Sequence, residues 1–274
     1  MTHSLPYAVN CSILFTELPI LERPAAARSA GFDAVEFWWP FASVVPADTE
    51  VDAFTRAVEE AGVQLVGLNF AAGDMPAGDR GLLSQPARSK EFRDNVAVTV
   101  GIGDQLGCRV FNALYGNRVA GVVAEEQDEL AAENLVLAAQ AAAQIGAQVV
   151  IEPISGAEHY PLLTATDAFA VIDRVHARSG LDNLALLADL YHLSVNGEDL
   201  DALIAEHVDR IGHVQIADAP GRNQPGTGIL AIDSYLLSLE QHGYAGWVGL
   251  EYKPLGASSD SFGWVAPNRR SAGR

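Results

Sequence analysis

Residues 146–152 read GAQVVIE, a glycine followed by a short apolar run that ends in a glutamate. A strand as apolar as AQVVI is typical of a parallel sheet that is buried on both faces. Glycine often follows the end of a helix, because it adopts the left-handed backbone conformation without strain. The stretch therefore predicts a helix that ends before Gly146 and a buried strand over residues 147–152.

The same order of residues recurs along the chain. Glycine comes shortly before a strand-like run at Gly31, Gly62, Gly107, Gly146, Gly180 and Gly243. Apolar residues with helical spacing precede several of these glycines: Val51, Phe54, Val58 and Ala61; Phe92, Val96 and Val100; Phe169, Ile172 and Val175. With two further runs, AVNCSIL and IGHVQIAD, eight strands are predicted, at 8–14, 33–37, 63–69, 108–113, 147–152, 184–189, 211–216 and 247–251.

Eight strands that alternate with helices predict an α/β fold, the (β/α)8 TIM barrel. The composition does not break along the chain, so we expect a single catalytic domain over residues 1–274. A doubly wound open sheet is the alternative. The first strand is not followed by a GxGxxG fingerprint or a glycine-rich phosphate loop, which weakens that alternative.

The composition limits the class of partner. Apolar residues make up 49% of the chain, enough for a sizeable core. With 17 Lys+Arg against 35 Asp+Glu, the net charge of -18 repels nucleic acids and anionic lipids. The two cysteines, Cys11 and Cys108, have no metal-type spacing, and no apolar run is long enough to span a membrane. We expect a cytoplasmic protein with a small-molecule substrate. The sequence leaves the oligomeric state open, with a homo-oligomer as one option.

Polar residues end most of the predicted strands. They are Glu36, Asn69, Asn112, Glu152, Asp189, Gln215 and Glu251. In a barrel the carboxyl ends of the strands meet at one mouth, where active sites of this fold lie. The last four strands end in Glu152, Asp189, Gln215 and Glu251, and clustered carboxylates repel unless a cation or a shared proton neutralises them. Oxygen ligands suit Mg²⁺ or Mn²⁺ better than zinc, so a divalent metal site is predicted there.

Long segments of the chain resemble hydroxypyruvate isomerases, within the sugar isomerase and epimerase superfamily of TIM barrels. The segments are VNCSILFTELPILERPAAARSAGFDAVEFWWPF, LNFAAGDMPAGDRG, GHVQIADAPGR and WVGLEYKP, and the similarity runs from about Val9 to Trp264. The resemblance implies that Glu152 and Glu251 are the acid/base pair and that Asp189 and Gln215 complete the metal-facing quartet. It also implies that Glu158, His192 and Arg222 contact the substrate.

The resemblance implies an isomerase that interconverts hydroxypyruvate and tartronate semialdehyde, or a related small hydroxy-oxo acid, in carbohydrate and glyoxylate metabolism. Two glutamates would move a proton through an enediolate with the help of the metal. A ketose 3-epimerase is the near alternative, but related epimerases usually have histidine in place of Gln215. A non-catalytic sugar-acid binding barrel is a second alternative, and a DNA-repair endonuclease of the same superfamily is disfavoured by the net charge.

Other residues near the strand ends have open roles. The sequence after the seventh strand, GRNQPGTGI, departs from the isomerase pattern at Asn223 and Ile229. His213 shares a strand face with Gln215 and is expected to be a hydrogen-bonded core histidine. Arg222, with Lys253 as its competitor, is the candidate for pairing with a substrate carboxylate. The aromatic residues Trp38, Trp39 and Phe41 either wall the pocket or pack within their loop.

Overall fold

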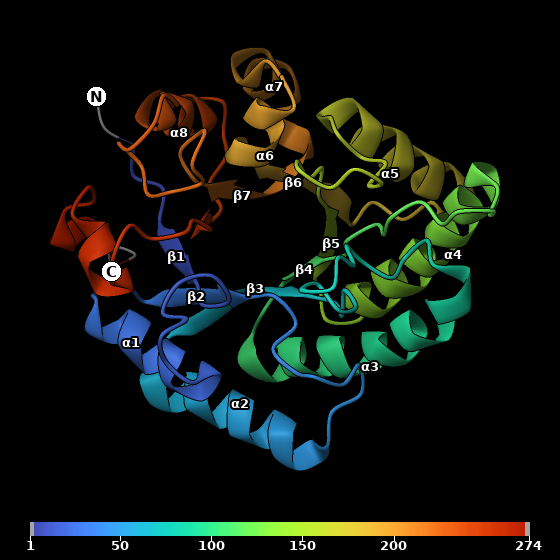
Figure 1. Cartoon of the computed structure of the whole chain (residues 1–274), viewed down its shortest axis with the longest axis horizontal. Coiled ribbons are helices and arrows are strands. Elements are labelled where there is room, and N and C mark those ends of the chain that lie inside the picture. The colour runs from blue at the N-terminus through green and yellow to red at the C-terminus, as the bar shows by residue number, and fades with distance from the viewer. Residues whose placement is uncertain (1–2, 272–274) are drawn as a thin grey trace.

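The computed structural model describes residues 3–271 and shows a closed barrel of eight parallel strands surrounded by helices (Figure 1). The strands are β1 (Tyr7–Asn10), β2 (Ala34–Phe37), β3 (Gln64–Asn69), β4 (Val110–Asn112), β5 (Gln148–Ile151), β6 (Leu184–Asp189), β7 (Ile211–Ile216) and β8 (Val248–Leu250). Each strand pairs with its neighbours in chain order, and β8 closes the barrel on β1. The predicted fold is confirmed.

Helices connect successive strands and cover the outside of the barrel (Figure 1). They are α1 (Arg23–Ser29), α2 (Asp48–Ala61), α3 (Ser89–Leu106), α4 (Ala124–Ala143), α5 (Ala165–Ser179), α6 (Leu190–Val195), α7 (Leu200–His207) and α8 (Ile232–Gln241). Their apolar faces pack inward, as the spacing predicts: Phe54 and Val58 of α2 and Phe92 and Val96 of α3 are buried. Among residues 3–271 no helix is both long and apolar enough to cross a bilayer.

The predicted glycine turns are present at the helix ends. Gly62 follows α2 with φ of 65°, and its N–H donates to the carbonyl of Glu59 at 3.0 Å. Gly180 follows α5 with φ of 70°, and its N–H donates to the carbonyl of His176 at 2.7 Å. These left-handed residues satisfy carbonyls at the helix end and turn the chain toward the next strand.

The first strand ends four residues earlier than predicted, so the range 8–14 is wrong at its carboxyl end. The chain turns at Asn10, whose side-chain oxygen accepts from Ser12 N–H at 3.0 Å and whose carbonyl accepts from Leu14 N–H at 3.0 Å. The residues after the turn still read as a strand because Cys11 and Leu14 are fully buried against the core. Asn10, not a residue near position 14, therefore occupies the polar end of this strand.

Candidate active site

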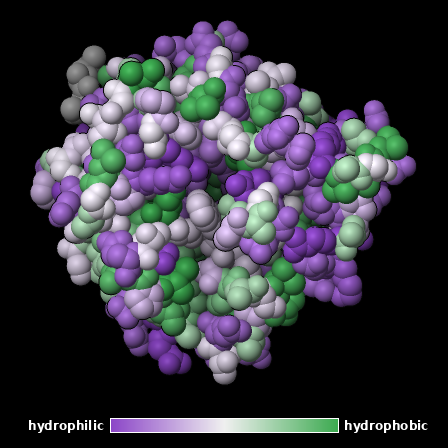
Figure 2. Space-filling model, in the orientation of Figure 1, coloured by the Kyte–Doolittle hydropathy of each residue, from purple (hydrophilic) through white to green (hydrophobic). Residues whose placement is uncertain are grey.

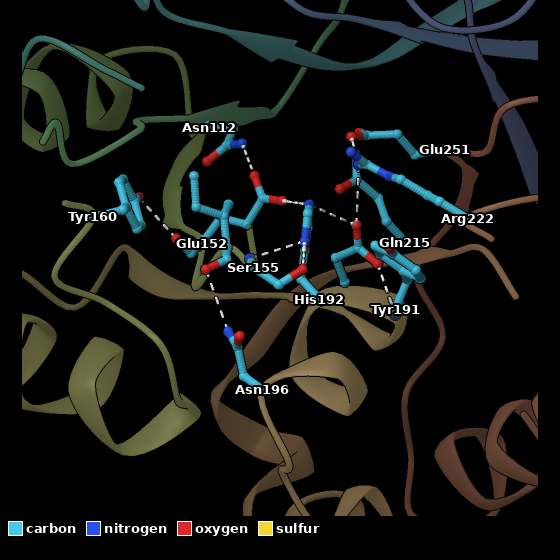
Figure 3. A network of polar contacts seen from close by, with 12 residues as sticks. Asn112, Glu152, Ser155, Tyr160, Tyr191, His192, Asn196, Gln215, Arg222 and Glu251 are labelled. Atoms are coloured by element: carbon cyan, nitrogen blue, oxygen red, sulfur yellow. Dashed lines mark hydrogen bonds and ion pairs between the residues drawn. The ribbon is translucent and has the colours of Figure 1, made fainter. Parts of the chain in front are cut away.

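A cavity of about 930 Å³ opens beside the carboxyl ends of the strands. Figure 2 shows a hollow near the centre of the face that Figure 1 presents. The cavity is lined by Trp38, Arg80, Glu152, His192, Arg222 and Glu251, among others. Asp189, the last residue of β6, and Gln215, next to the last residue of β7, are buried beside the cavity. Together with Glu152, His192, Arg222 and Glu251 they form the cluster described below, and Figure 3 shows its labelled members from close by.

Glu152 follows β5 and is buried in the cluster. Its Oε2 accepts a hydrogen bond from Asn112 Nδ2 at 2.8 Å, and its Oε1 lies 3.9 Å from His192 Nε2. Burial, and then the nearby carboxylates of Glu251 and Asp189, raise the pKa of Glu152 well above its ordinary value. A carboxyl group whose proton affinity is raised in this way is suited to exchange a proton as a general acid or base.

Glu251 follows β8 and faces the same cavity. Its Oε1 accepts from Arg222 Nη2 at 2.6 Å and its Oε2 from Asn10 Nδ2 at 2.8 Å. Burial raises the pKa of Glu251 to about 8, even though the guanidinium of Arg222 acts in the opposite direction. Glu152 and Glu251 therefore form a pair of buried carboxyl groups with raised pKa values on one cavity.

Asp189 and Gln215 each keep one buried oxygen without a hydrogen bond inside residues 3–271: Oδ2 of Asp189 and Oε1 of Gln215. The other oxygen of Asp189 accepts from Tyr191 N–H at 2.9 Å at the start of α6. Buried polar atoms without a partner carry a free-energy cost, so such oxygens point to a ligand. Together with the two glutamates they form an oxygen-only donor set, which fits Mg²⁺ or Mn²⁺.

Glu36 of β2 makes hydrogen-bond contacts with several side chains near the strand ends. Its Oε1 accepts from Asn10 Nδ2 at 3.0 Å and from Gln215 Nε2 at 2.7 Å, and its Oε2 lies 2.6 Å from His213 Nε2. His213 is thus a hydrogen-bonded core histidine, as predicted. Sequence reasoning missed the role of Asn10, because the first strand was extended past it, and assigned no role to Glu36.

His192 has one tautomer that fits its contacts. Its Nδ1 lies 3.0 Å from the backbone N–H of Ser155, which can only donate, so Nδ1 accepts and the proton of the neutral ring is on Nε2. Burial lowers the pKa of His192 to about 4, which keeps the ring neutral. One atom each of Glu152, Asp189 and His192 lie within 4.8 Å of one another, a spacing that a metal ion could use. Because Nε2 carries a proton, we assign His192 as a hydrogen-bond donor to the cavity and not as a metal ligand.

Arg222 reaches the cluster from the loop between β7 and α8. Besides its bond to Glu251, its Nη2 lies 3.5 Å from Asp189 Oδ2, and its guanidinium lies 5.5 Å from the centre of the Tyr191 ring. Arg222 has a left-handed backbone with φ of 55°, an uncommon conformation for arginine. The buried carboxylate of Asp218 orders this loop by accepting from the N–H groups of Gly226 and Gly228 at 2.9 and 2.8 Å.

Other predicted residues lie outside the cluster. Glu158 is exposed in the loop after β5 and does not line the cavity, so the structure gives no support for its expected substrate contact. Lys253 is exposed at the cavity wall. The aromatic residues divide, because Trp38 lines the cavity whereas Trp39 packs edge-on against Phe41 with ring centres 5.0 Å apart.

The two departures from the isomerase pattern also lie away from the cavity lining. Asn223 donates from Nδ2 to the carbonyl of Lys253 at 2.8 Å, a contact between two loops. Ile229 is 84% exposed. Neither substitution therefore changes a residue that faces the cluster.

Comparison with known proteins agrees with this architecture. A model of the xylose isomerase-like TIM barrel family matches residues 24–267. The chain is 55% identical over 271 residues to a Streptomyces coelicolor protein named "Putative hydroxypyruvate isomerase", with 97% of each chain covered. It is 34% identical over 270 residues to the hydroxypyruvate isomerase of Escherichia coli, with 97% and 100% covered.

Two further proteins extend the comparison. A 2-oxo-tetronate isomerase of Cupriavidus necator is 32% identical over 271 residues, with 95% of this chain and 97% of the relative covered. A crystal structure from Brucella melitensis, named AP endonuclease, family 2, superposes with a TM-score of 0.86 at 34% identity and covers 96% and 98% of the two chains. The chain is an enzyme of the isomerase type and belongs to the hydroxypyruvate isomerase family, within the xylose isomerase-like TIM barrels.

Proposed function

We propose that the enzyme interconverts hydroxypyruvate and tartronate semialdehyde, or a closely related hydroxy-oxo acid. The observation that carries the proposal is the pair of buried glutamates, Glu152 and Glu251, whose pKa values are both raised and which face one cavity. The names of the relatives, hydroxypyruvate isomerase and 2-oxo-tetronate isomerase, support a small hydroxy-oxo acid as the substrate.

The reaction moves hydrogen between adjacent carbons. A base removes a proton from C3 of hydroxypyruvate, and the electron pair of the broken C–H bond forms a C2–C3 double bond while the C2 carbonyl oxygen takes the negative charge. A proton is then returned to C2, the C3 hydroxyl loses its proton and becomes the aldehyde, and the C2 oxygen gains one and becomes a hydroxyl. The overall composition is unchanged, so no oxidant or reductant is needed.

The cavity residues divide this work. One of Glu152 and Glu251 removes the carbon-bound proton, and that residue or the other returns a proton to C2; this help is typically worth about 10²–10⁴-fold in rate. His192 donates from Nε2, and Arg222 from its guanidinium, to the substrate oxygens that gain negative charge. Both donors are held in place before substrate binds, His192 by Ser155 and Arg222 by Glu251.

We propose that Glu152, Asp189, Gln215 and Glu251 hold one Mg²⁺ or Mn²⁺ ion. Asp189 Oδ2 and Gln215 Oε1, which make no hydrogen bond within residues 3–271, support this assignment. When bound, the ion would act as a Lewis acid toward substrate oxygens and lower the free energy of the enediolate.

A role in DNA cleavage is disfavoured by charge. The Brucella structure carries an endonuclease name, but this chain has a net charge of -18, and a DNA backbone would meet a strongly repulsive field. Ketose epimerisation would use the same two glutamates, and the choice between it and the proposed reaction depends on the substrate.

Proton NMR in deuterated water tests the proposal. Hydroxypyruvate incubated with the enzyme, with and without Mg²⁺ or Mn²⁺, should exchange its C3 hydrogens for deuterium and form tartronate semialdehyde. Exchange with a ketose but not with hydroxypyruvate would identify an epimerase instead. Binding of hydroxypyruvate without any exchange would identify a non-catalytic barrel and contradict the proposal.

A further inference from the structure

A hydroxy-oxo acid brings a carboxylate into a cavity that already holds several carboxylates. Arg222 is the cation closest to the cluster, but its guanidinium is paired with Glu251 and lies near Asp189. Its guanidinium is therefore already engaged by residues of the site. The proposed divalent ion would be shared among the carboxylates of Glu152, Asp189 and Glu251. A substrate carboxylate would therefore bind best to a further positive group that these residues do not engage.

Arg80 lines the same cavity from the loop between β3 and α3 and has no ion pair within residues 3–271. The neighbouring acid, Asp79, is committed elsewhere: its Oδ2 accepts from Arg88 Nη1 at 2.5 Å and from the N–H of Asp74 at 2.8 Å. Arg80 is thus a half-buried guanidinium beside a polar cavity, in a protein with a large excess of negative charge.

The guanidinium of Arg80 is also held in place. Its Nη1 donates to the carbonyls of Met75 at 2.9 Å and Asp79 at 2.6 Å, whereas Nε and Nη2 make no hydrogen bond to the described part of the chain. The backbone is fixed as well, because the Arg80 carbonyl accepts from Gly116 N–H at 2.9 Å. At Gly81 a β-carbon would lie 2.0 Å from the carbonyl oxygen of Leu114, so only glycine allows this close approach of the two loops.

We propose that Arg80 binds the carboxylate of the substrate and thereby selects hydroxy-oxo acids over neutral ketones. The assignment rests on the proposed function. Nε and Nη2 of a guanidinium form the two-pronged donor that matches a carboxylate, and both are uncommitted in Arg80. Lys253, the other unpaired cation at the cavity, is exposed and has a flexible side chain without a hydrogen bond inside residues 3–271, so it is a poorer anchor.

The cavity volume supports recognition by charge. About 930 Å³ is far more space than a three-carbon acid fills, so close packing alone cannot hold hydroxypyruvate in one orientation. An anchored carboxylate would fix one end of the substrate within the cavity that Glu152 and Glu251 also line. The same anchor would accept a four-carbon oxo acid, with the remaining space taking the longer chain.

The experiment compares hydroxypyruvate with hydroxyacetone, which has a methyl group in place of the carboxylate. In Arg80→Met the KM for hydroxypyruvate should rise about 10–100-fold, whereas the inhibition constant of hydroxyacetone should stay within about twofold. Arg80→Lys keeps the charge but loses the two-pronged donor, so its KM for hydroxypyruvate should lie between that of the parent enzyme and that of Arg80→Met. Lys90→Met, which removes an exposed positive charge at the start of α3, is the matched control and should leave both constants unchanged.

The outcomes separate this inference from the proposed function. If the parent enzyme isomerises no hydroxy-oxo acid, the proposed function fails and the inference fails with it. If the parent is active and Arg80→Met keeps its KM within about twofold, only the assignment of Arg80 is wrong. A larger increase of KM in Lys253→Met would move the anchor to Lys253, and equal losses for hydroxyacetone and hydroxypyruvate would show that Arg80 only supports its loop.

Discussion

Gln215 Nε2 donates a hydrogen bond to Glu36 Oε1 at 2.7 Å, and this contact fixes which end of the amide faces the candidate metal site. With its nitrogen held by Glu36, the oxygen of Gln215 is left facing the cluster without a partner in residues 3–271. Asn10 extends the relationship, since its Nδ2 donates to both Glu36 and Glu251. Glu36 is not itself a proposed ligand of the ion. It orients two of the proposed ligands, Gln215 directly and Glu251 through Asn10.

Glu36→Gln tests this positioning role. The substitution keeps the size of the side chain but removes its charge and replaces one carboxylate oxygen by an NH2 group. Either the contacts of Asn10 and Gln215 with Oε1 or the contact of His213 with Oε2 is then lost, and the oxygen that remains is a weaker acceptor. We expect the dissociation constant for Mn²⁺ to rise about 10–100-fold, the usual effect of losing an outer partner of a metal ligand. Isothermal titration calorimetry measures it directly, and the melting temperature shows whether the barrel remains folded.

Two further variants separate position from charge. Glu36→Asp keeps the negative charge but is one methylene shorter, so it should also lose affinity if reach to Gln215 matters. Glu126→Gln removes a charge from the exposed start of α4 and should change nothing. Full affinity in Glu36→Asp together with a loss in Glu36→Gln would mean that only the charge of Glu36 is important.

The fold was predictable because its signals are local. Gly62 and Gly180 mark helix ends through their own backbone preference, and Phe54 and Val58 mark a buried helix face through their spacing. The end of the first strand was not predictable, because Cys11 and Leu14 are as buried as strand residues although they lie in a turn.

The site was predictable only as a set of strand ends. Sequence reasoning brought Glu152, Asp189, Gln215 and Glu251 together, because parallel strands of a barrel end at one mouth. Contacts between distant strands carry no such signal. The Glu36–Gln215 bond joins residues 179 positions apart, and the availability of Arg80 depends on Asp79 pairing with Arg88.

Glu152→Gln and Glu251→Gln test the proton transfer. Each substitution keeps the shape of the side chain and removes the group that exchanges a proton, so turnover of hydroxypyruvate should fall about 10²-fold or more. Deuterium exchange at C3, followed by NMR, checks the carbon–hydrogen step by itself. If both variants keep turnover within a few-fold of the parent, the two glutamates do not move the proton.

Metal binding should depend on pH in a defined direction. Burial raises the pKa of Glu251 to about 8 in the ion-free protein, so below that pH the carboxyl must lose a proton before it can hold a cation. The affinity for Mn²⁺ should therefore increase about tenfold per pH unit for each proton displaced, and level off above pH 8. Calorimetry between pH 6 and 9, in two buffers with different ionisation enthalpies, gives the affinity and counts the protons. An affinity that is independent of pH would contradict binding through Glu251.

Arg222→Met should affect charged and neutral ligands alike, in contrast to Arg80→Met. The guanidinium of Arg222 contacts Glu251 at 2.6 Å and lowers its pKa relative to burial alone, so its loss should leave Glu251 protonated over a wider range of pH. We expect turnover of hydroxypyruvate to fall about 10-fold or more, and the pH at which activity is half-maximal to move upward. The inhibition constants of hydroxypyruvate analogues with and without a carboxylate should change by similar factors. Steady-state kinetics from pH 6 to 9 measures all three. An increase in KM confined to anionic ligands, with an unchanged pH profile, would instead give Arg222 the role proposed for Arg80.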